Sequence, residues 1–211
     1  KKDGFQFNSH CDTEVIVYLC QKYGIEFVNH LNGMFAIAIW DSSQKQLLLV
    51  RDRLGIKPLY YTIDKENDIY FGSETFALKA SSLNLEIDPN AVDLYLTYRS
   101  IPAPYSIYKY VKKLMPGELL IFNENDIEIK KYWELKFETN YSKTSLDFTE
   151  EFIERLKKSV KDQSFSDAPI GCLLSGGLDS SLITAFLAEA SNKKIKTIFV
   201  SPGEGYWNES I

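Results

Sequence analysis

The sequence predicts two regions of different fold class. The first is an α+β region of antiparallel sheets flanked by helices, because pairs of short apolar runs joined by polar turns recur up to residue 133. The second is the start of an α/β region with a parallel sheet, because a strand, a glycine-rich turn, a helix and another strand follow one another near the end. We expect domains at residues 1–133 and 148–211, joined by a polar, irregular linker at residues 134–147.

Composition narrows the class of protein. The chain has 211 residues, of which 45% are hydrophobic, enough to build a core. Its net charge of −5 and scattered basic residues argue against a nucleic-acid partner. The sequence has no apolar run near the roughly 18 residues of a membrane span and no apolar leader, so we expect a cytoplasmic protein with no membrane partner.

The cysteines and histidines limit the available chemistry. Cys11, Cys20 and Cys172 show no metal-binding spacing, and we expect reduced, structural thiols. With only His10 and His30 in the chain, a histidine-based catalytic triad or metal site has little to draw on.

Three hairpins and three helices are expected in the first region. The hairpins pair residues 35–41 with 46–52, 59–63 with 69–72, and 119–122 with 127–133. The helices lie at residues 15–24, with Asp12 as N-cap and Gly24 at the end, at 73–79, and at 88–96, where Asp88 caps and Pro89 takes the first position.

The second region reads as a helix followed by a βαβ unit. The helix spans residues 148–161, with Phe152, Leu156 and Val160 on one face. A buried strand at 169–174, a helix at 182–190 and a strand at 195–200 follow, and such a crossover joins parallel strands.

Residues 175–181, Ser-Gly-Gly-Leu-Asp-Ser-Ser, join the strand to the helix and carry the strongest functional signal. Gly176 and Gly177 lack a Cβ, so an anion can approach their N–H groups closely. The helix N-terminus adds unpaired N–H groups and a positive dipole end, and the serines add hydroxyl donors, so phosphate is the expected ligand. A carboxylate beside a phosphate is suited to binding Mg²⁺, so we assign Asp179 as a ligand of this metal ion.

A simpler interpretation of this loop is a bend that glycine permits, with Asp179 and the serines capping the helix. The combination of suitable residues in a strand, turn and helix context favours nucleotide binding instead. The loop lacks the lysine and spacing of the Walker A motif, which disfavours P-loop kinase or GTPase chemistry.

A second segment, residues 31–40 followed by 51–61, contains the charged turn Arg51-Asp52-Arg53-Leu54-Gly55-Ile56-Lys57-Pro58. By itself it indicates a tight turn whose charges are available to pair, and a structural role is at least as good an interpretation as a functional one.

Both segments resemble known families. Residues 175–181 resemble the pyrophosphate-binding loop of the ATP pyrophosphatases, which adenylate a carboxylate or carbonyl oxygen and release pyrophosphate. Residues 31–40 and 51–61 resemble the core of class II glutamine amidotransferase domains, which hydrolyse glutamine with an N-terminal cysteine. Together, over essentially the whole chain, they resemble the glutamine-hydrolysing asparagine synthetases.

This resemblance implies a class II amidotransferase sandwich followed by the start of an ATP-pyrophosphatase domain. It implies an ATP-dependent carbon–nitrogen ligase that amidates aspartate to asparagine through β-aspartyl-AMP, with ammonia from glutamine and release of AMP and pyrophosphate. The substrates would be glutamine, aspartate and ATP, with Mg²⁺ as cofactor, in a homodimer.

Alternatives of other kinds stay open. A relative could close a β-lactam ring or amidate another carboxylate, and a degenerate relative could bind without catalysis. A phosphoribosyl-pyrophosphate amidotransferase would share residues 51–58 but is not expected to carry residues 175–181.

The resemblance also implies roles for single residues. Asp12 matches the residue that binds the α-amino group of glutamine, for which a carboxylate is suited, although a plain N-cap is the alternative. Leu173 and Val200 match positions next to the nucleotide, with ordinary core residues as the alternative. The expected ATP-binding residues are Leu173, Ser175, Gly176, Gly177, Leu178, Asp179, Ser180, Ser181 and Val200.

One departure from the family concerns the nucleophile. Residue 1 is Lys1 where the family has cysteine, and the three cysteines of the chain lack the free α-amino group that serves as base. We therefore assign no catalytic residue, and we expect the chain to be an internal fragment that is inactive alone.

Overall fold

The structure, a computed structural model, describes residues 4–9, 11–81, 83–124, 126–191 and 194–200. The chain divides into two compact units, Lys1–Lys136 and Phe137–Ile211, and each is described by itself. The division falls inside the polar segment that separates the two predicted regions. Residues 201–211 of the second predicted domain lie outside the described residues.

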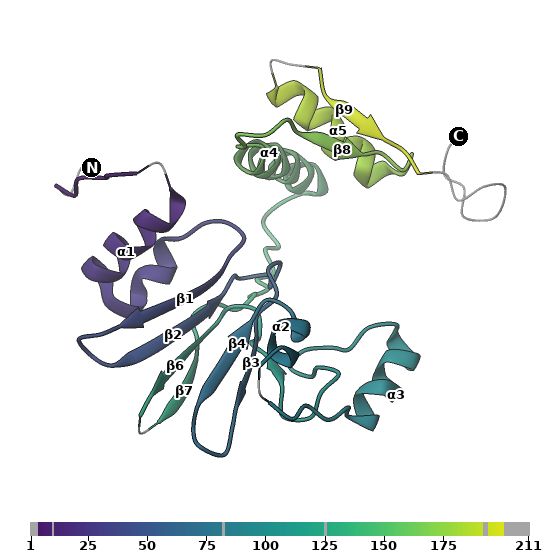
Figure 1. Ribbon diagram of the computed structural model, residues 1–211. Coiled ribbons are helices and arrows are strands. Elements are labelled where there is room, and N and C mark those ends of the chain that lie inside the picture. The colour runs from purple at the N-terminus through teal and green to yellow at the C-terminus, as the bar shows by residue number, and fades with distance from the viewer. Residues whose placement is uncertain (1–3, 10, 82, 125, 192–193, 201–211) are drawn as a thin grey trace. The chain divides into compact units, whose positions relative to one another are not determined.

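Two antiparallel sheets make up the first unit (Figure 1). The larger sheet has the order β1-β2-β6-β7, and the smaller sheet the order β4-β3-β5. The three predicted hairpins are confirmed as β1 with β2, β3 with β4 and β6 with β7, whereas the two-residue strand β5 is not predicted. Their bounds are Ala36–Asp41 for β1, Gln46–Arg51 for β2, Tyr60–Ile63 for β3, Ile69–Gly72 for β4, Lys112–Lys113 for β5, Glu118–Asn123 for β6 and Ile127–Lys131 for β7.

Strand β2 is buried on both faces, and this explains the layers of the unit. Leu48 and Val50 pack with Phe27 of the 3₁₀-helix η1, Gly24–His30. Leu47 and Leu49 point the other way, because side chains alternate along a strand, and join Leu59, Tyr61, Leu114 and Leu120. The larger sheet is therefore a middle layer, with helices on one face and the smaller sheet on the other.

Helix α1, Asp12–Tyr23, begins at Asp12, so the prediction that Asp12 is the N-cap is wrong. The N-cap is Cys11, which has extended backbone and makes no capping hydrogen bond through its side chain. The Asp12 carboxylate accepts instead from the Thr13 hydroxyl at 3.4 Å. Gly24 lies at the C-terminal end with φ of 56°, as predicted.

The other predicted helices of this unit are confirmed as α2, Thr75–Lys79, and α3, Pro89–Tyr98. The Asp88 carboxylate accepts the N–H of Asn90 at 2.9 Å, so it caps α3 as the sequence indicates. Helix η1 is not predicted.

The second unit contains α4, Ser145–Gln163, β8, Gly171–Leu173, α5, Leu178–Ala190, and β9, Lys196–Ile198. Strands β8 and β9 are parallel, which confirms the βαβ prediction. The predicted fold class, antiparallel sheets with helices followed by a parallel pair, is therefore confirmed.

Helix α4 begins inside the segment predicted as linker, three residues before the expected start. Thr144 and Asp147 form a capping box, in which the Asp147 carboxylate accepts the Thr144 N–H at 2.8 Å and the Thr144 hydroxyl accepts the Asp147 N–H at 3.2 Å. Each residue satisfies a donor that the helix end would leave unpaired, so the helix starts there.

Burial in the second unit differs from expectation. Leu156 and Val160 of α4 line a small hollow with Ile183 and Leu187 of α5, but Phe152, predicted on the same face, is exposed. The strand predicted as buried is also largely exposed. A strand of a parallel sheet is buried by neighbours on both sides, whereas within the described residues β8 pairs only with β9.

Gly117 lies where three segments meet. Its N–H donates to the Asp52 carbonyl at 3.0 Å, and its carbonyl accepts the N–H of Tyr132 at 2.9 Å. Its φ is +70°, and a Cβ there would lie 2.3 Å from the Trp133 carbonyl oxygen. This position therefore requires glycine for space as well as for conformation.

We expect Gly117→Ala to lower the free energy of unfolding by about 2 kcal/mol more than Gly24→Ala, measured by urea denaturation. Both glycines have positive φ, but a Cβ on Gly24 would meet nothing within 4 Å, so the control carries the backbone strain without the collision. Equal losses in the two variants would contradict the steric argument.

Candidate functional site

The turn after β2 is built around the buried carboxylate of Asp52, which is 1% exposed. Oδ1 accepts the N–H groups of Leu54 at 3.1 Å and Ile56 at 3.0 Å. Oδ2 accepts those of Lys57 at 2.9 Å and Phe35 at 3.3 Å. Four donors use the full capacity of a carboxylate, so Asp52 closes the turn and ties it to the start of β1.

The two arginines beside Asp52 bind backbone carbonyls. Arg51 is largely buried and donates to the carbonyls of Lys57 at 2.9 Å, Gly55 at 2.7 Å and Leu114 at 2.6 Å. Arg53 donates to the carbonyl of Leu31 at 2.6 Å. Within the described part of the chain no ion pair joins residues 51–53 to one another, and the bonds of the two arginines to backbone carbonyls favour the structural interpretation of this turn.

Two further residues complete this turn. Gly55 has φ of +65°, and a Cβ there would lie 2.8 Å from Cγ of Pro116. The Tyr132 hydroxyl donates to the Arg51 carbonyl at 2.6 Å, and burial raises the pKa of Tyr132 to about 12. The sequence analysis missed Tyr132, because its partner is 81 residues away in the chain.

Asp12 lies exposed on the first turn of α1, in the first unit. Among the described residues, its carboxylate contacts the side chains of its neighbours, Thr13 at 3.4 Å and Cys11 at 3.6 Å. Both contacts are long and therefore weak. The carboxylate is thus available to a cationic group from outside.

In the second unit, residues 175–181 form the predicted turn between β8 and α5. Gly176 takes φ of 92°, which glycine adopts readily. The hydroxyls of Ser180 and Ser181 donate to the Gly177 carbonyl at 3.1 and 2.8 Å. Ser180 Oγ accepts the Ser175 N–H at 3.2 Å, so the serines close the loop internally.

The donors left for a ligand are backbone groups. Among the described residues, the N–H groups of Leu178, Asp179 and Ser180 have no acceptor, whereas that of Ser181 bonds to the Gly177 carbonyl at 3.1 Å. These groups lie at the positive end of the α5 dipole. The loop therefore has the donor set of an anion site.

Leu173, Leu178 and Val200 are exposed, by 74%, 74% and 77%. The alternative that Leu173 and Val200 are core residues is therefore wrong for this structure. The Leu174 N–H donates to the Ile198 carbonyl at 3.0 Å, and carboxyl ends of parallel strands meet at one edge. Val200 accordingly lies at the same edge of the β8–β9 pair as Ser175.

Asp179 is exposed in the first turn of α5. No group of three or more potential metal ligands from His, Cys, Asp and Glu occurs among the described residues. A single carboxylate still fits Mg²⁺, which commonly binds through one or two carboxylates together with substrate phosphates. The loop thus suits a metal that arrives with a phosphate ligand.

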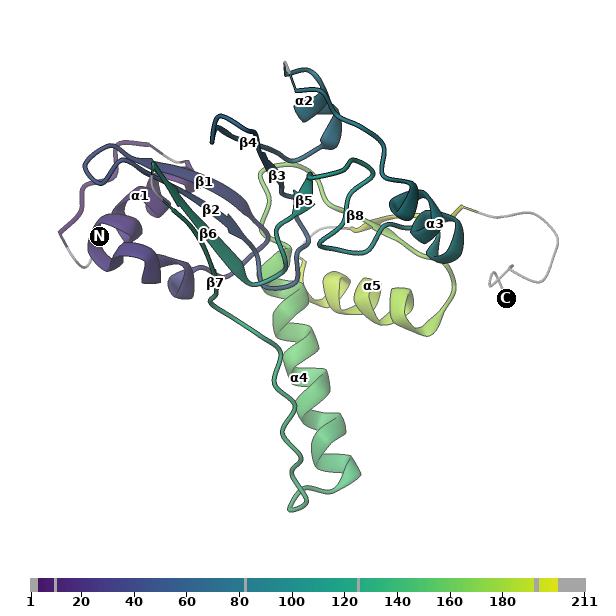
Figure 2. The ribbon, with the colours of Figure 1, turned by 90° about the horizontal axis from the view of Figure 1, so that it is seen from below.

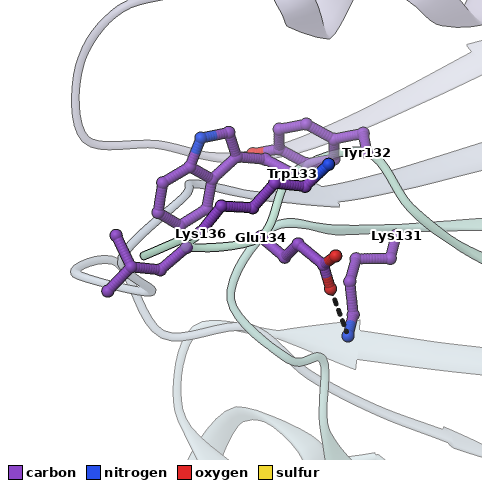
Figure 3. A pocket seen from close by; sticks show the side chains of 6 residues that line it. Lys131, Tyr132, Trp133, Glu134 and Lys136 are labelled. Atoms are coloured by element: carbon purple, nitrogen blue, oxygen red, sulfur yellow. Dashed lines mark ion pairs between the residues drawn. The ribbon is translucent and has the colours of Figure 1, made fainter. Parts of the chain in front are cut away.

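A surface hollow of about 760 Å³ lies along residues 131–136, after β7 (Figure 3). An ion pair joins Lys131 Nζ to Glu134 Oε2 at 3.5 Å in this hollow. It contains none of the predicted site residues, and we assign it no ligand. No helix among the described residues is long and apolar enough to cross a membrane.

Comparison with protein families identifies the class. Residues 1–133 match the family described as glutamine amidotransferase domain, and the chain belongs to this family. Residues 151–209 match a second family, described as asparagine synthase. The two matches occur in one chain, and they confirm the resemblance to glutamine-hydrolysing asparagine synthetases.

Individual relatives agree. A Methanocaldococcus jannaschii protein provisionally named glutamine-hydrolysing asparagine synthetase 2 is 38% identical over 100% of this chain and 41% of its own length. Glutamine-hydrolysing asparagine synthetase 1 of Bacillus subtilis is 35% identical over 93% of this chain and 31% of its own. The amidase chry2 of Gibberella zeae is 32% identical over 88% of this chain and 28% of its own. The chain therefore spans less than half the length of these relatives.

We expect Asp52→Asn to lower the free energy of unfolding by about 3 kcal/mol, because an amide nitrogen would face two buried N–H donors in either orientation. Asp41→Asn is the matched control. Its carboxylate also holds a turn, but the N–H and hydroxyl of Ser43 and the N–H of Gln44 all donate to Oδ1, an oxygen that asparagine retains. We therefore expect this control to lower the free energy of unfolding by less than about 1 kcal/mol. Urea denaturation measures both, and similar losses would contradict the role of the buried carboxylate.

The raised pKa of Tyr132 predicts a dependence on pH. In the unfolded chain Tyr132 ionises near its ordinary pKa of 10.0, while the folded chain keeps the proton up to about 12. The contribution of neutral Tyr132 to the free energy of unfolding is thus fully present below pH 10 and is lost as pH rises toward 12. We expect Tyr132→Phe to cost about 1 kcal/mol at pH 8 and the difference from wild type to shrink above pH 10. A difference that stays constant up to pH 11.5 would be evidence against this.

Proposed function

We propose that the intact protein is a glutamine-hydrolysing asparagine synthetase. It amidates aspartate to asparagine through β-aspartyl-AMP, uses ammonia from glutamine, and releases AMP and pyrophosphate. The observation that carries this proposal is the presence, in one chain, of the turn closed around Asp52 within an amidotransferase domain and of the anion-binding loop 175–181 within a synthase domain.

We assign residues 1–133 to the C-terminal part of the amidotransferase domain, 134–147 to a linker, and 148–211 to the N-terminal part of the synthetase domain. The extents of the two family matches and the division after Lys136 support these bounds. The start of α4 at Ser145 favours a shorter linker. A cytoplasmic location stays a prediction from the sequence, and a homodimer stays a prediction from the resemblance.

ATP is proposed to bind at the carboxyl edge of β8 and β9. The N–H groups of Leu178, Asp179 and Ser180 would hold the pyrophosphate part, since they lie unpaired at the helix N-terminus. Gly176 and Gly177 let the phosphates approach the backbone, and the hydroxyls of Ser175, Ser180 and Ser181 keep the loop in shape. The exposed Leu173 and Val200 would flank the nucleoside.

Asp179 is proposed to hold Mg²⁺ together with the phosphates of ATP. When bound there, the metal ion would neutralise charge on the pyrophosphate that leaves as aspartate is adenylated. The loop itself would orient the phosphates and supply backbone donors where negative charge collects.

Asp12 is proposed to bind the α-amino group of glutamine. Because its carboxylate does not cap α1 and has only weak neighbouring contacts, it can form a charge-assisted bond with an ammonium group. The rest of the glutamine site, including the nucleophile, is not assigned to residues of this chain.

A second candidate is an amidating enzyme with a different carboxylate acceptor. It is favoured by the similarity to a protein named as an amidase, which has the same order of segments over 88% of this chain.

The full-length protein tests the proposal. Pyrophosphate release from ATP is measured with glutamine and with aspartate or other carboxylic acids, and the amide product is identified. Release that requires aspartate and yields asparagine supports the synthetase. Glutamine hydrolysis without such release would favour another acceptor, and absence of both activities would favour a non-catalytic relative.

We expect Asp179→Asn in the full-length protein to raise the KM for MgATP by about tenfold, because the loop loses its metal-facing charge. We also expect calorimetry to show far weaker binding of Mg²⁺ alone than of Mg²⁺ with ATP. Asp162→Asn, on α4, is the control, since Asp162 pairs with Lys158 on an exposed face. An unchanged KM in the Asp179 variant would remove the metal assignment.

A further inference from the structure

The carboxylate of Glu14, in the first turn of α1, binds Asn8 and Ser9 of the segment at residues 5–9, which precedes the helix. Its Oε1 accepts the N–H of Asn8 at 2.7 Å, and its Oε2 accepts the N–H of Ser9 at 2.8 Å. Oε2 also accepts the hydroxyl proton of Ser9. All three partners are donors, so the site suits an ionised carboxylate.

A hydrogen-bond chain leads from Glu14 to the residue before Asp12. Because Ser9 gives its hydroxyl proton to Glu14, its oxygen is left to accept, and it accepts the N–H of Cys11 at 3.2 Å. The Cys11 carbonyl in turn accepts the Glu14 N–H at 3.3 Å. Both backbone groups of Cys11, immediately before Asp12, are thus bound: the N–H to Glu14 through Ser9, and the carbonyl to Glu14 directly.

Tyr18, one turn further along α1, holds the start of the same segment. Its hydroxyl donates to the Gln6 carbonyl at 2.7 Å and lies 3.3 Å from Glu14 Oε1. Its ring contacts those of Phe5 and Phe7, with centroids 4.8 and 5.1 Å apart. Residues 5–9 therefore have a fixed path along α1.

The bonds to Glu14 also fix its charge. The hydrogen bond from the Ser9 side chain, followed by that from the Asn8 N–H, lowers the pKa of Glu14 below its ordinary value. At neutral pH the carboxylate is ionised and acts only as an acceptor, so Ser9 must be the donor in their contact. The direction of the chain to Cys11 follows from this.

We propose that Glu14 is a positioning residue for glutamine, which sets the place of Asp12 through Ser9 and Cys11. This inference rests on the proposed role of Asp12 in binding the α-amino group of glutamine. Glu14 does not touch the substrate in this scheme. Instead it holds the N-terminal turn of α1 so that the Asp12 carboxylate faces the ammonium group without rearrangement on binding.

The test uses Glu14→Gln and Ser9→Ala in the full-length protein, with steady-state glutamine hydrolysis as the assay. Glutamine would oppose an amide nitrogen to one of the donors, so we expect Glu14→Gln to raise the KM for glutamine about tenfold and to leave kcat within about twofold. Ser9→Ala removes the bond from the hydroxyl to Glu14 and the acceptor for the Cys11 N–H, but it keeps the two N–H bonds to Glu14. We therefore expect a rise of about threefold, and the double variant should match Glu14→Gln alone.

Ammonia-dependent amidation bypasses the glutamine site and should be unchanged in both variants. Glu26→Gln is the matched control, because Glu26 is an exposed carboxylate of η1 that accepts a hydrogen bond from the Asn29 side chain at 2.6 Å. We expect wild-type KM in this control. Parallel loss of glutamine-dependent and ammonia-dependent activity would overturn the inference in favour of general destabilisation.

An unchanged KM for glutamine in both variants would also overturn it. If Glu14→Gln fails to fold, Ser9→Ala alone decides, because it retains the two N–H bonds to Glu14. Absence of glutamine hydrolysis in the wild-type protein would instead reject the proposed function of the first domain, and this inference with it. The two failures are thus distinguishable.

Discussion

The first unit depends on the buried carboxylate of Asp52. A carboxylate taken out of water is costly unless its lone pairs are filled, and here four N–H groups fill them. Those donors come from the turn itself and from the start of β1, so the charge is stable only when both segments are in place. The Gly117 N–H adds a link from the Asp52 carbonyl to β6, which connects the turn to the middle of the larger sheet.

The same turn unites the two faces of the sandwich. Arg51 reaches the carbonyl of Leu114, which packs in the cluster on the side of the smaller sheet, while Arg53 reaches that of Leu31, which packs against the cluster on the side of η1. Figure 2 shows the larger sheet between α1 and the smaller sheet. Strand β2 ends at Arg51, and Arg53 lies in the turn that follows, so the two side chains are not restricted to one face as residues i and i+2 of a strand would be. The charged turn at residues 51–58 therefore has a structural role. The proposed glutamine contact lies elsewhere, at the first turn of α1.

The sequence predicts what is local and misses what is distant. Hairpins, helix ends such as Asp88 with Pro89, and the strand–turn–helix at residues 171–190 follow from patterns a few residues long. The bond from Arg51 to the Leu114 carbonyl and the bond from Tyr132 to the Arg51 carbonyl span 63 and 81 residues, and they leave no local signal. The capping box of Thr144 with Asp147 has a spacing that is visible in the sequence. At α1, the carboxylate that binds the preceding residues is that of Glu14 rather than that of Asp12.

The pairing of β2 with β6 has a consequence for synthesis of the protein. Leu47 to Val50 pair with Leu119 to Phe122, so the middle of the larger sheet joins segments that leave the ribosome far apart in time. Until β6 emerges, the hairpin β1–β2 presents the open hydrogen-bonding edge of an apolar strand, which invites pairing with other chains. The nascent domain thus passes through an interval in which the apolar strand β2 has no partner on one side.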